Sequence, residues 1–474
     1  MEERQDFLHS FKPAIDLLSE HVEAGHNLRI ITHADADGIA SGGILCLMAS
    51  RLGTCWKISC EKRLDSKTLR RIASEKNQLI IFSDFGSGYL ELIGEHLPET
   101  DVLILDHHLP EEVEVERITQ VNPMLHGIDG SRELAASGVC YMLANRVDDA
   151  NRDLSPLGLL GAIGDQQDKG EKKSLLGLNV EIEEDASKTQ LLNKQIDLIF
   201  YGYETRPIAK AIANTTTPFI PGLSGREDNC VALLKDVGID LKRRGRWRAL
   251  RDLAGNEKQL LFSALSDHMV SQGLDGDVVH DLIGTIYTFP REESWTPMRD
   301  CREYSSLLNA CARMGRPSLG LCITIGDRDK ALKEAEETLH EYRRKIGTYL
   351  EWVIGGGRIE ELDNIYLLQG GDEIMDTLIG VVASIILSQG LKNKEKPILA
   401  TANTDEGLMK VSGRSTETLL KRGLHLGRVL KEASMEVDGA GGGHDIAAGA
   451  YIPADKEVRF IGLVNELVQR NAEE

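Results

Sequence analysis

The sequence predicts an α/β protein with an N-terminal, doubly wound parallel sheet and a smaller C-terminal α/β domain. Three observations support this fold class. Short apolar runs alternate with helical patterns over the first third of the chain, acids and histidines follow the ends of those runs, and a long amphipathic segment separates two regions of different composition. Strands that alternate with helices are typical of parallel sheets whose two faces are both covered.

Three apolar runs in the first third have the length and composition of buried strands, at 28–32 (LRIIT), 79–83 (LIIFS) and 102–105 (VLIL). A helix rich in small residues is expected over 38–52, and a second one is expected after Ser137. A further apolar segment, 157–165, ends in Asp165. Ligands of such sheets collect beyond the carboxyl ends of the strands.

The middle of the chain is mostly helical in pattern, and it contains the basic run LKRRGRWRALR at 241–251. We expect this run to be a solvated helix face, with a nucleic-acid track or a partner surface as alternatives. Apolar residues spaced three and four apart predict a long connecting helix at about 327–353, which the glycines that follow would end. The expected domains are a catalytic domain, an insertion and junction region, the connecting helix and a substrate-binding domain, at 1–205, 206–325, 326–356 and 357–474.

Composition restricts the class of protein. The chain has 474 residues, 41% of them hydrophobic, and no apolar run long enough to span a membrane. Its charged N-terminus lacks the apolar core of a signal peptide, and its eight cysteines form no CxxC pair. These features predict a soluble, cytoplasmic protein. The net charge of −20 repels polyanions at long range, although bound metals or a local basic groove can reverse the sign.

The motif HADADG places His33, Asp35 and Asp37 at alternate positions directly after the first predicted strand. In extended backbone, alternate side chains share one face. Carboxylate oxygens with a few imidazoles suit manganese or magnesium better than zinc or copper. Two such metals about 3.5–4 Å apart can clamp a phosphoryl group and hold a bridging hydroxide for in-line attack.

Other candidate ligands follow the later runs. Asp84 comes after the second predicted strand and is a natural bridging ligand, and Asp106, His107 and His108 come after the third. Adjacent histidines point in different directions, so one can bind metal while the other faces the substrate phosphate. With Asp165 at the end of the apolar segment 157–165, four segments therefore deliver ligand-type residues to one edge of the sheet.

Two motifs near the C-terminus are suited to binding an anion. Gly442 and Gly443 let backbone amides approach a phosphate, His444 adds a donor, and Arg414 is suited to a bidentate contact. The segment that follows His444 is expected to be helical. Arg313 and Arg316 are expected to line a passage between domains.

Together these motifs resemble those of the DHH phosphoesterases. HADADG, the Asp84 of FSDFG, DHH at 106–108 and the Asp165 of GAIGD have the order and spacing of the four family motifs. GGGHDIAAG resembles the motif of the DHH-associated domain, and NACARMGRPSLGL resembles the junction of RecJ-type nucleases. The chain as a whole is similar to archaeal RecJ-like single-strand exonucleases that associate with the GINS replication complex.

The resemblance implies a role for each matching residue. One metal would be held by His33, Asp35 and Asp84, and the other by Asp37, Asp84, His107 and Asp165. His108 would contact the scissile phosphate or assist proton transfer, and Asp84 would be the second catalytic residue. The substrate would contact Arg313, Ser412, Arg414, Gly442, Gly443 and His444. The fourth motif departs from the family pattern, since IGDQQD replaces an apolar continuation, and Asp168 is therefore an alternative to Asp165.

The expected activity is manganese- or magnesium-dependent, exonucleolytic hydrolysis of single-stranded DNA or RNA, with a role in replication or repair. A phosphodiesterase for short oligoribonucleotides or cyclic dinucleotides and a replisome scaffold that binds GINS are the alternatives.

Overall fold

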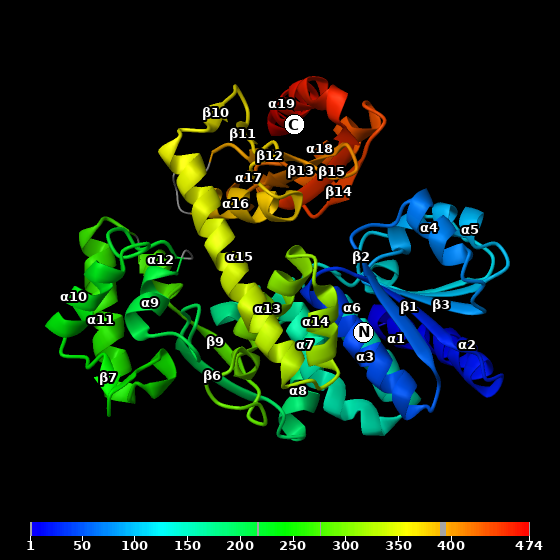
Figure 1. Ribbon diagram of the computed structural model, residues 1–474, viewed down its shortest axis with the longest axis horizontal. Coiled ribbons are helices and arrows are strands. Elements are labelled where there is room, and N and C mark those ends of the chain that lie inside the picture. The colour runs from blue at the N-terminus through cyan, green and yellow to red at the C-terminus, as the bar shows by residue number, and fades with distance from the viewer. Residues whose placement is uncertain (1, 216–217, 275, 389–394, 474) are drawn as a thin grey trace. The chain divides into compact units, whose positions relative to one another are not determined.

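The computed structural model describes residues 2–215, 218–274, 276–388 and 395–473 (Figure 1). The chain divides into two compact units. The first comprises 1–214 and 225–339, and the second comprises 215–224 and 340–474. The boundary falls within helix α15 (Lys330–Gly355), which overlaps the connecting helix expected at 327–353.

The first unit contains a five-stranded sheet in the order β2-β1-β3-β4-β5, in which every neighbouring pair is parallel. The doubly wound parallel sheet predicted from the sequence is therefore confirmed. Its strands are β1 (Leu28–His33), β2 (Trp56–Glu61), β3 (Leu79–Ser83), β4 (Asp101–Leu105) and β5 (Ile118–Val121).

Strands β2 and β5 were not among the predicted strands, and both are edge strands. The central strands β1, β3 and β4 are almost wholly buried and read as apolar runs, whereas most residues of β2 and β5 are only half-buried. An edge strand packs on fewer neighbours, so its sequence need not be continuously apolar.

Helices cover both faces of this sheet (Figure 1). Helices α3 (Ala36–Arg51) and α6 (Ala136–Val147) contact one face, together with α2 (Phe11–Glu23). Helices α4 (Ser66–Ala73) and α5 (Leu90–His96) cover the other face over a core of aliphatic and phenylalanine side chains. Helix α7 (Ser155–Gly164) packs on α3 and α6, and the remaining helices of this region are α1 (Glu2–His9) and α8 (Leu178–Lys188).

The middle region is mostly helical, as the sequence predicted, but it also contains two small antiparallel ladders. Its elements are β6 (Asn193–Leu198), α9 (Ile208–Ala213), α10 (Glu227–Asp236), β7 (Lys242–Arg243), β8 (Arg246–Trp247), α11 (Gly255–Ser271), α12 (Gly276–His280) and β9 (Ile283–Thr288). The prediction of a helix for the basic run 241–251 was wrong, because Gly245 and its neighbours form a tight turn between β7 and β8.

Helices α13 (Cys301–Arg313) and α14 (Pro317–Thr324) follow the middle region and pack on the helices beside the parallel sheet of the first unit. Helix α13 contacts α7, and α14 contacts α3. Across the described ranges, no helix is both long and apolar enough to cross a membrane.

The second unit contains a six-stranded mixed sheet in the order β10-β11-β12-β13-β15-β14. Helix α16 (Asp376–Ser388) packs on one face, and α18 (Leu426–Met435) and α19 (Glu457–Glu473) share a core with the other. The other elements are β10 (Ile359–Glu361), β11 (Tyr366–Gln369), β12 (Ile398–Asn403), β13 (Leu408–Arg414), α17 (Glu417–Leu420), β14 (Ala440–Gly443) and β15 (Ala447–Pro453).

The helical prediction for the residues after His444 was wrong. They enter β15, whose alternating buried residues Ala448, Ala450 and Ile452 face the core shared with α18 and α19. Small residues are compatible with either a helix or a strand, and here the pairing of β15 with both β13 and β14 decides in favour of the strand.

Candidate metal centre

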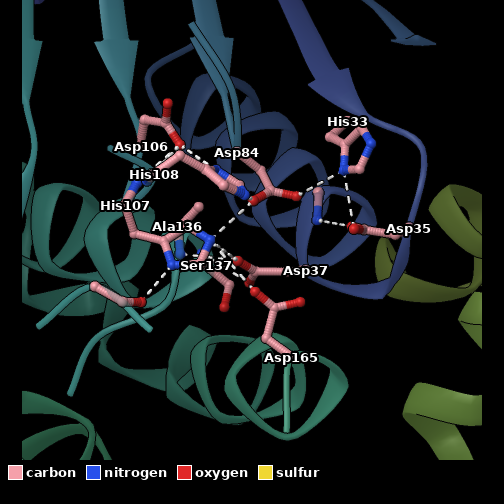
Figure 2. Close-up of polar contacts among 12 residues, drawn as sticks. His33, Asp35, Asp37, Asp84, Asp106, His107, His108, Ala136, Ser137 and Asp165 are labelled. Atoms are coloured by element: carbon pink, nitrogen blue, oxygen red, sulfur yellow. Dashed lines mark hydrogen bonds and ion pairs between the residues drawn. The ribbon is translucent and has the colours of Figure 1, made fainter. Parts of the chain in front are cut away.

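The candidate ligands meet at the carboxyl edge of the parallel sheet (Figure 2). Strand β1 ends at His33, β3 is followed by Asp84, and β4 is followed by the DHH motif. Helix α7 ends next to Asp165. All groups of three or more candidate ligands found among the described residues lie here: His33, Asp35 and Asp84; Asp37, Asp84, His107 and Asp165; and Asp84, His107 and His108.

Asp84 belongs to all three groups and lies between His33 and His107 (Figure 2). Its Oδ2 is 3.4 Å from His33 Nδ1, and its Oδ1 is 3.3 Å from His107 Nε2. The residue is 1% exposed, and neither of its carboxylate oxygens accepts a well-formed hydrogen bond from the described part of the chain. A buried carboxylate requires a partner, and two cations on either side of Asp84 would provide it.

The backbone of Asp84 is also unusual, with a φ of 63°. Aspartate is among the few non-glycine residues that adopt this left-handed conformation, and such conformations cluster at functional sites. Its amide donates to the Leu105 carbonyl, which ties the end of β3 to the end of β4. This hydrogen bond helps to hold Asp84 in its left-handed conformation.

The first group is built on the HADADG motif. His33 Nδ1 lies 2.9 Å from Asp35 Oδ2, and Asp35 Oδ1 accepts a hydrogen bond from the amide of Gly38 at the start of α3. Burial lowers the pKa of His33, but Asp35 and Asp84 outweigh it and raise that pKa well above its ordinary value. Burial raises the pKa of Asp35, but His33 outweighs it and lowers that pKa well below its ordinary range.

The second group concentrates negative charge around one histidine. His107 Nε2 is 3.3 Å from Asp165 Oδ2 and 3.8 Å from Asp37 Oδ2. Burial and the charge of Asp84 raise the pKa of Asp37 to about 7. Burial and the charge of Asp37 likewise raise the pKa of Asp165 well above its ordinary range. Divalent cations bound here would offset the repulsion between Asp84 and Asp37 and the repulsion between Asp37 and Asp165.

Asp106 organises the turn that carries the two histidines. Its Oδ1 accepts hydrogen bonds from the amides of His107 and His108 and from His108 Nδ1, and its Oδ2 accepts one from the amide of Ser87. Burial raises the pKa of Asp106, but His108 outweighs it and holds that pKa well below its ordinary range. The imidazole of His108 is 38% exposed, whereas that of His107 is fully buried.

Two supports of Asp37 were not predicted from the sequence. The amides of Ala136 and Ser137, at the N-terminus of α6, donate to its two carboxylate oxygens at 2.8 and 3.0 Å. Gly161 on α7 lies so close that a Cβ there would be 2.0 Å from Asp37 Oδ1. The amide of Ala36 also donates to Asn309 Oδ1, which links α13 to the HADADG motif. These contacts join residues 99 to 273 positions apart, and no local pattern reveals them.

The donors present fit divalent cations. The groups combine four buried or half-buried carboxylates with imidazoles, a set typical of manganese and magnesium sites. Asp168, the alternative to Asp165, is absent from these groups and instead receives a 2.6 Å contact from Arg302 Nη2. The structure therefore brings Asp165, and not Asp168, to the other ligands.

The candidate substrate residues are divided between the two units. Arg313 ends α13 in the first unit, and Arg316 donates to Thr338 Oγ1 at 3.0 Å. Ser412 and Arg414 lie on β13 of the second unit, where Arg414 donates to Ser384 Oγ and to the Gly413 carbonyl. Gly442 and Gly443 lie on β14, and the amide of His444 closes the turn to β15. Ser412 and Gly442 both pair with Gly449, so they occupy one row of the sheet.

Three family models match the chain. The DHH family, N-terminal domain, matches residues 27–162, the DHH-CID domain matches 200–283, and the DHHA1 domain matches 375–470. An uncharacterized protein of Methanocaldococcus jannaschii is 32% identical over 455 residues, which cover 93% of each chain.

Solved structures share the fold at low sequence identity. CDC45 from Entamoeba histolytica has a TM-score of 0.67 at 12% identity, over 98% of this chain and 99% of its own. RecJ from Thermus thermophilus in complex with Mn2+ has a TM-score of 0.57 at 18% identity, over 97% of this chain. This chain covers 55% of that RecJ, about half its length.

The family matches and the fold agree with the resemblance drawn from the four motifs. The chain therefore belongs to the DHH family, with a RecJ-like fold that combines DHH, DHH-CID and DHHA1 domains.

Proposed function

We propose that this protein is a manganese- or magnesium-dependent exonuclease that removes nucleotides from single-stranded nucleic acid. DHH superfamily members are metal-dependent phosphoesterases, so the proposal concerns the substrate and the mode of cleavage. The observation that carries it is the position of Asp84, which is shared by one ligand group around His33 and another around His107. Two adjacent cation sites with a common carboxylate suit a phosphodiester substrate.

The first cation would be held by His33, Asp35 and Asp84, and the second by Asp37, Asp84, His107 and Asp165. Bound there, divalent cations would neutralise the phosphoryl oxygens and make water more acidic. The role of the protein is then to keep these ligands in place before substrate arrives. The α6 amides hold Asp37, and Asp106 holds the turn of His107 and His108.

His108 is the candidate proton donor. Its Nδ1 contacts Asp106 Oδ1 at 2.8 Å, which orients the ring, and its side chain is 38% exposed. In hydrolysis, a water oxygen bonds to phosphorus as the ester bond to the leaving oxygen breaks, and that oxygen takes up a proton. The partly exposed imidazole of His108 is suited to stabilise the phosphate or to supply this proton.

The proposal also covers the residues that would bind the substrate and a protein partner. Arg414, Ser412, Gly442, Gly443 and His444 would contact the phosphate backbone, and Arg313 would contribute from the first unit.

Binding to the GINS replication complex is a second candidate role, supported by the fold shared with CDC45 over nearly the whole of both chains. Catalysis and partner binding do not exclude one another. A pull-down with purified GINS tests the partner role, which a failure to bind would remove.

The central experiment follows the release of mononucleotides from an end-labelled, single-stranded oligonucleotide in the presence of Mn2+. Asp84→Ala should abolish release, because both cation sites lose their common ligand. Asp149→Ala is the matched control, since its side chain is 84% exposed in the same unit and should leave release unchanged. Undiminished cleavage by Asp84→Ala would overturn the proposal.

Comparison of a dinucleotide with a long oligomer separates the alternative substrate class. A clear preference for the dinucleotide would identify a phosphodiesterase for short oligoribonucleotides in place of an exonuclease. The labelled end that shortens first gives the polarity, and parallel DNA and RNA substrates give the sugar preference.

A further inference from the structure

A strongly cationic hairpin lies outside the metal centre, in the DHH-CID region of the first unit (β7 in Figure 1). Strands β7 and β8 and their turn carry four exposed cations within five residues, namely Lys242, Arg243, Arg244 and Arg246. The whole chain carries a net charge of −20. This concentration of positive charge is therefore opposite in sign to the net charge of the chain.

The hairpin has a defined conformation. Lys242 pairs with Trp247, and Arg243 pairs with Arg246, across a two-residue turn. Arg244 and Gly245 have φ angles of 51° and 81°, as hairpin turns with two left-handed residues require. The exposed cations are thus presented on a preformed ribbon.

The base of the hairpin is anchored by an ion pair between the buried Arg248 and the half-buried Glu257. Arg248 directly follows β8, and its Nη1 and Nη2 contact the two carboxylate oxygens of Glu257 at 2.7 and 2.5 Å. Arg248 also donates to the carbonyl oxygens of Asp240 and Asp252, on either side of the hairpin. The two terminal nitrogens of this arginine are thus paired inside the protein, in contrast to the four exposed cations that precede it.

None of the four exposed cations forms a close ion pair among the described residues, although the charge of Arg243 acts on Glu257 at longer range. Arg243 and Arg246 lie directly opposite each other in the ladder, and like charges in that position destabilise a hairpin. The protein therefore maintains an unfavourable arrangement that an external polyanion would relieve. Three of the four cations are arginines, whose planar guanidinium groups match phosphate geometry.

An aromatic surface adjoins these cations. Trp247 is 51% exposed, and Lys242 Nζ lies 4.3 Å from its ring centroid. Trp247 also lines a cavity of about 210 Å³ together with Pro207, Val231, Lys210 and Glu227. An exposed ring beside cations suits nucleic acid, because bases stack on aromatic side chains while the cations track phosphates.

The lining of the cavity favours a base over an acidic peptide. Lys210 offers a donor and Glu227 an acceptor, as the edge of a base requires, whereas an acidic side chain would be repelled by Glu227. We propose that the β7–β8 hairpin is a second binding site for single-stranded nucleic acid, separate from the metal centre. Phosphates would lie on the cations, and a base would pack on Trp247.

The inference rests on the proposed function for the choice of polymer, but its test needs no catalysis. Binding of a fluorescent 20-nucleotide oligo-dT is measured by anisotropy with EDTA present, over a range of salt concentrations. The quadruple variant K242Q/R243Q/R244Q/R246Q removes the cations. The matched control, K12Q/R152Q/K188Q/R226Q, removes the same charge from exposed positions of the same unit.

The salt dependence is the decisive readout. Removal of one phosphate-binding cation should reduce the slope of log K against log salt by about 0.7, so the slope of the quadruple variant should fall by up to about 3. The control should retain the wild-type slope. Trp247→Ala should weaken binding roughly 5- to 150-fold, as expected for the loss of one stacked base. Circular dichroism melting of each variant checks that the fold is kept.

An unchanged slope in the quadruple variant would overturn the inference, as would an equal reduction in the control. The inference would also be overturned if the quadruple variant still bound oligo-dT but no longer bound an acidic protein. That result would assign the hairpin to a protein partner. Hydrolysis of a dinucleotide should be unaffected, because it does not reach the hairpin. Hairpin-dependent binding without cleavage by the wild-type protein would refute the proposed function alone, and cleavage without hairpin-dependent binding would refute this inference alone.

Discussion

The Nδ1 of His107 donates a hydrogen bond to the carbonyl oxygen of Gly130 at 2.5 Å. In the neutral ring this contact assigns the proton to Nδ1, so Nε2, 3.3 Å from both Asp84 Oδ1 and Asp165 Oδ2, is the nitrogen that would bind a cation. The same carbonyl accepts a hydrogen bond from Gln167 Nε2, and Gln167 Oε1 in turn accepts one from Asn179. A metal-binding histidine is commonly oriented by such an outer partner.

Gln167→Ala should therefore weaken metal binding although Gln167 is not a candidate ligand. Loss of an outer partner reduces metal affinity by about 10- to 100-fold, and we expect a loss in that range for Mn2+, measured by calorimetric titration. Gln166→Ala is the control, because Gln166 is adjacent but exposed. Equal affinities for the two variants would show that Gly130 is held without Gln167.

Asp165 and Asp168 should behave in opposite ways. Asp165→Asn removes a member of the second ligand group, so Mn2+ affinity should fall by more than the roughly 100-fold of an outer-shell change. Asp168→Asn should leave the affinity unchanged and lower the free energy of unfolding by about 2 kcal/mol, because it weakens the contact with Arg302. Titration and thermal melting of both variants would distinguish the roles, and a larger affinity loss for Asp168→Asn would reverse the assignment.

Gly161→Ala should disturb the site by steric contact alone. Its Cβ would lie 2.0 Å from Asp37 Oδ1 and 2.1 Å from Ser137 Oγ, so Asp37 or helix α7 must move. We expect a loss of about 1–3 kcal/mol in stability and at least a roughly tenfold loss in Mn2+ affinity.

Gly347→Ala is the matched glycine control, because nothing lies within 4 Å of the new Cβ in helix α15. It should leave metal binding intact and stabilise the protein by roughly 0.5–1 kcal/mol. Wild-type metal affinity in Gly161→Ala would contradict the tight packing of α7 on Asp37.

The buried guanidinium of Arg29 should make stability depend on Glu75. Arg29 is 1% exposed, and its Nε lies 2.7 Å from Glu75 Oε2. Glu75→Ala should lower the free energy of unfolding by about 3 kcal/mol, because it leaves a buried charge without its partner. Glu99→Ala, at an exposed position, should have little effect in the same denaturant titration.

The same pair predicts a pH dependence. Burial raises the pKa of Glu75, but hydrogen bonds from Arg29 and Lys57 outweigh it and lower the pKa from 4.5 to about 2. A lowered pKa stabilises the folded state above pH 4.5, and this contribution is lost as the pH falls from 4.5 to 2. Denaturant titrations between these limits should show a smaller pH dependence for Glu75→Ala than for the wild-type protein; identical dependences would contradict the role of Glu75.

The sequence by itself determined the central strands and the candidate ligands. Buried strands read as continuous apolar runs, and a side chain placed directly after such a run must lie at the edge of a parallel sheet. His33, Asp84 and His107 could thus be predicted to meet without knowledge of the fold. Patterns were weaker where burial is partial or residues are small, and so β2, β5, the β7–β8 hairpin and the strand after His444 were missed or misassigned.

The tertiary structure alone decided which groups hold the ligands. Asp37 is bound by amides of α6 about 100 residues away, and Asp165 at the end of α7 joins the ligands whereas Asp168 contacts Arg302. The link from Gln167 through Gly130 to His107 likewise joins three separate segments. Sequence periodicity reports how a segment is buried along its own axis, whereas these contacts depend on which distant segments the folded core brings together.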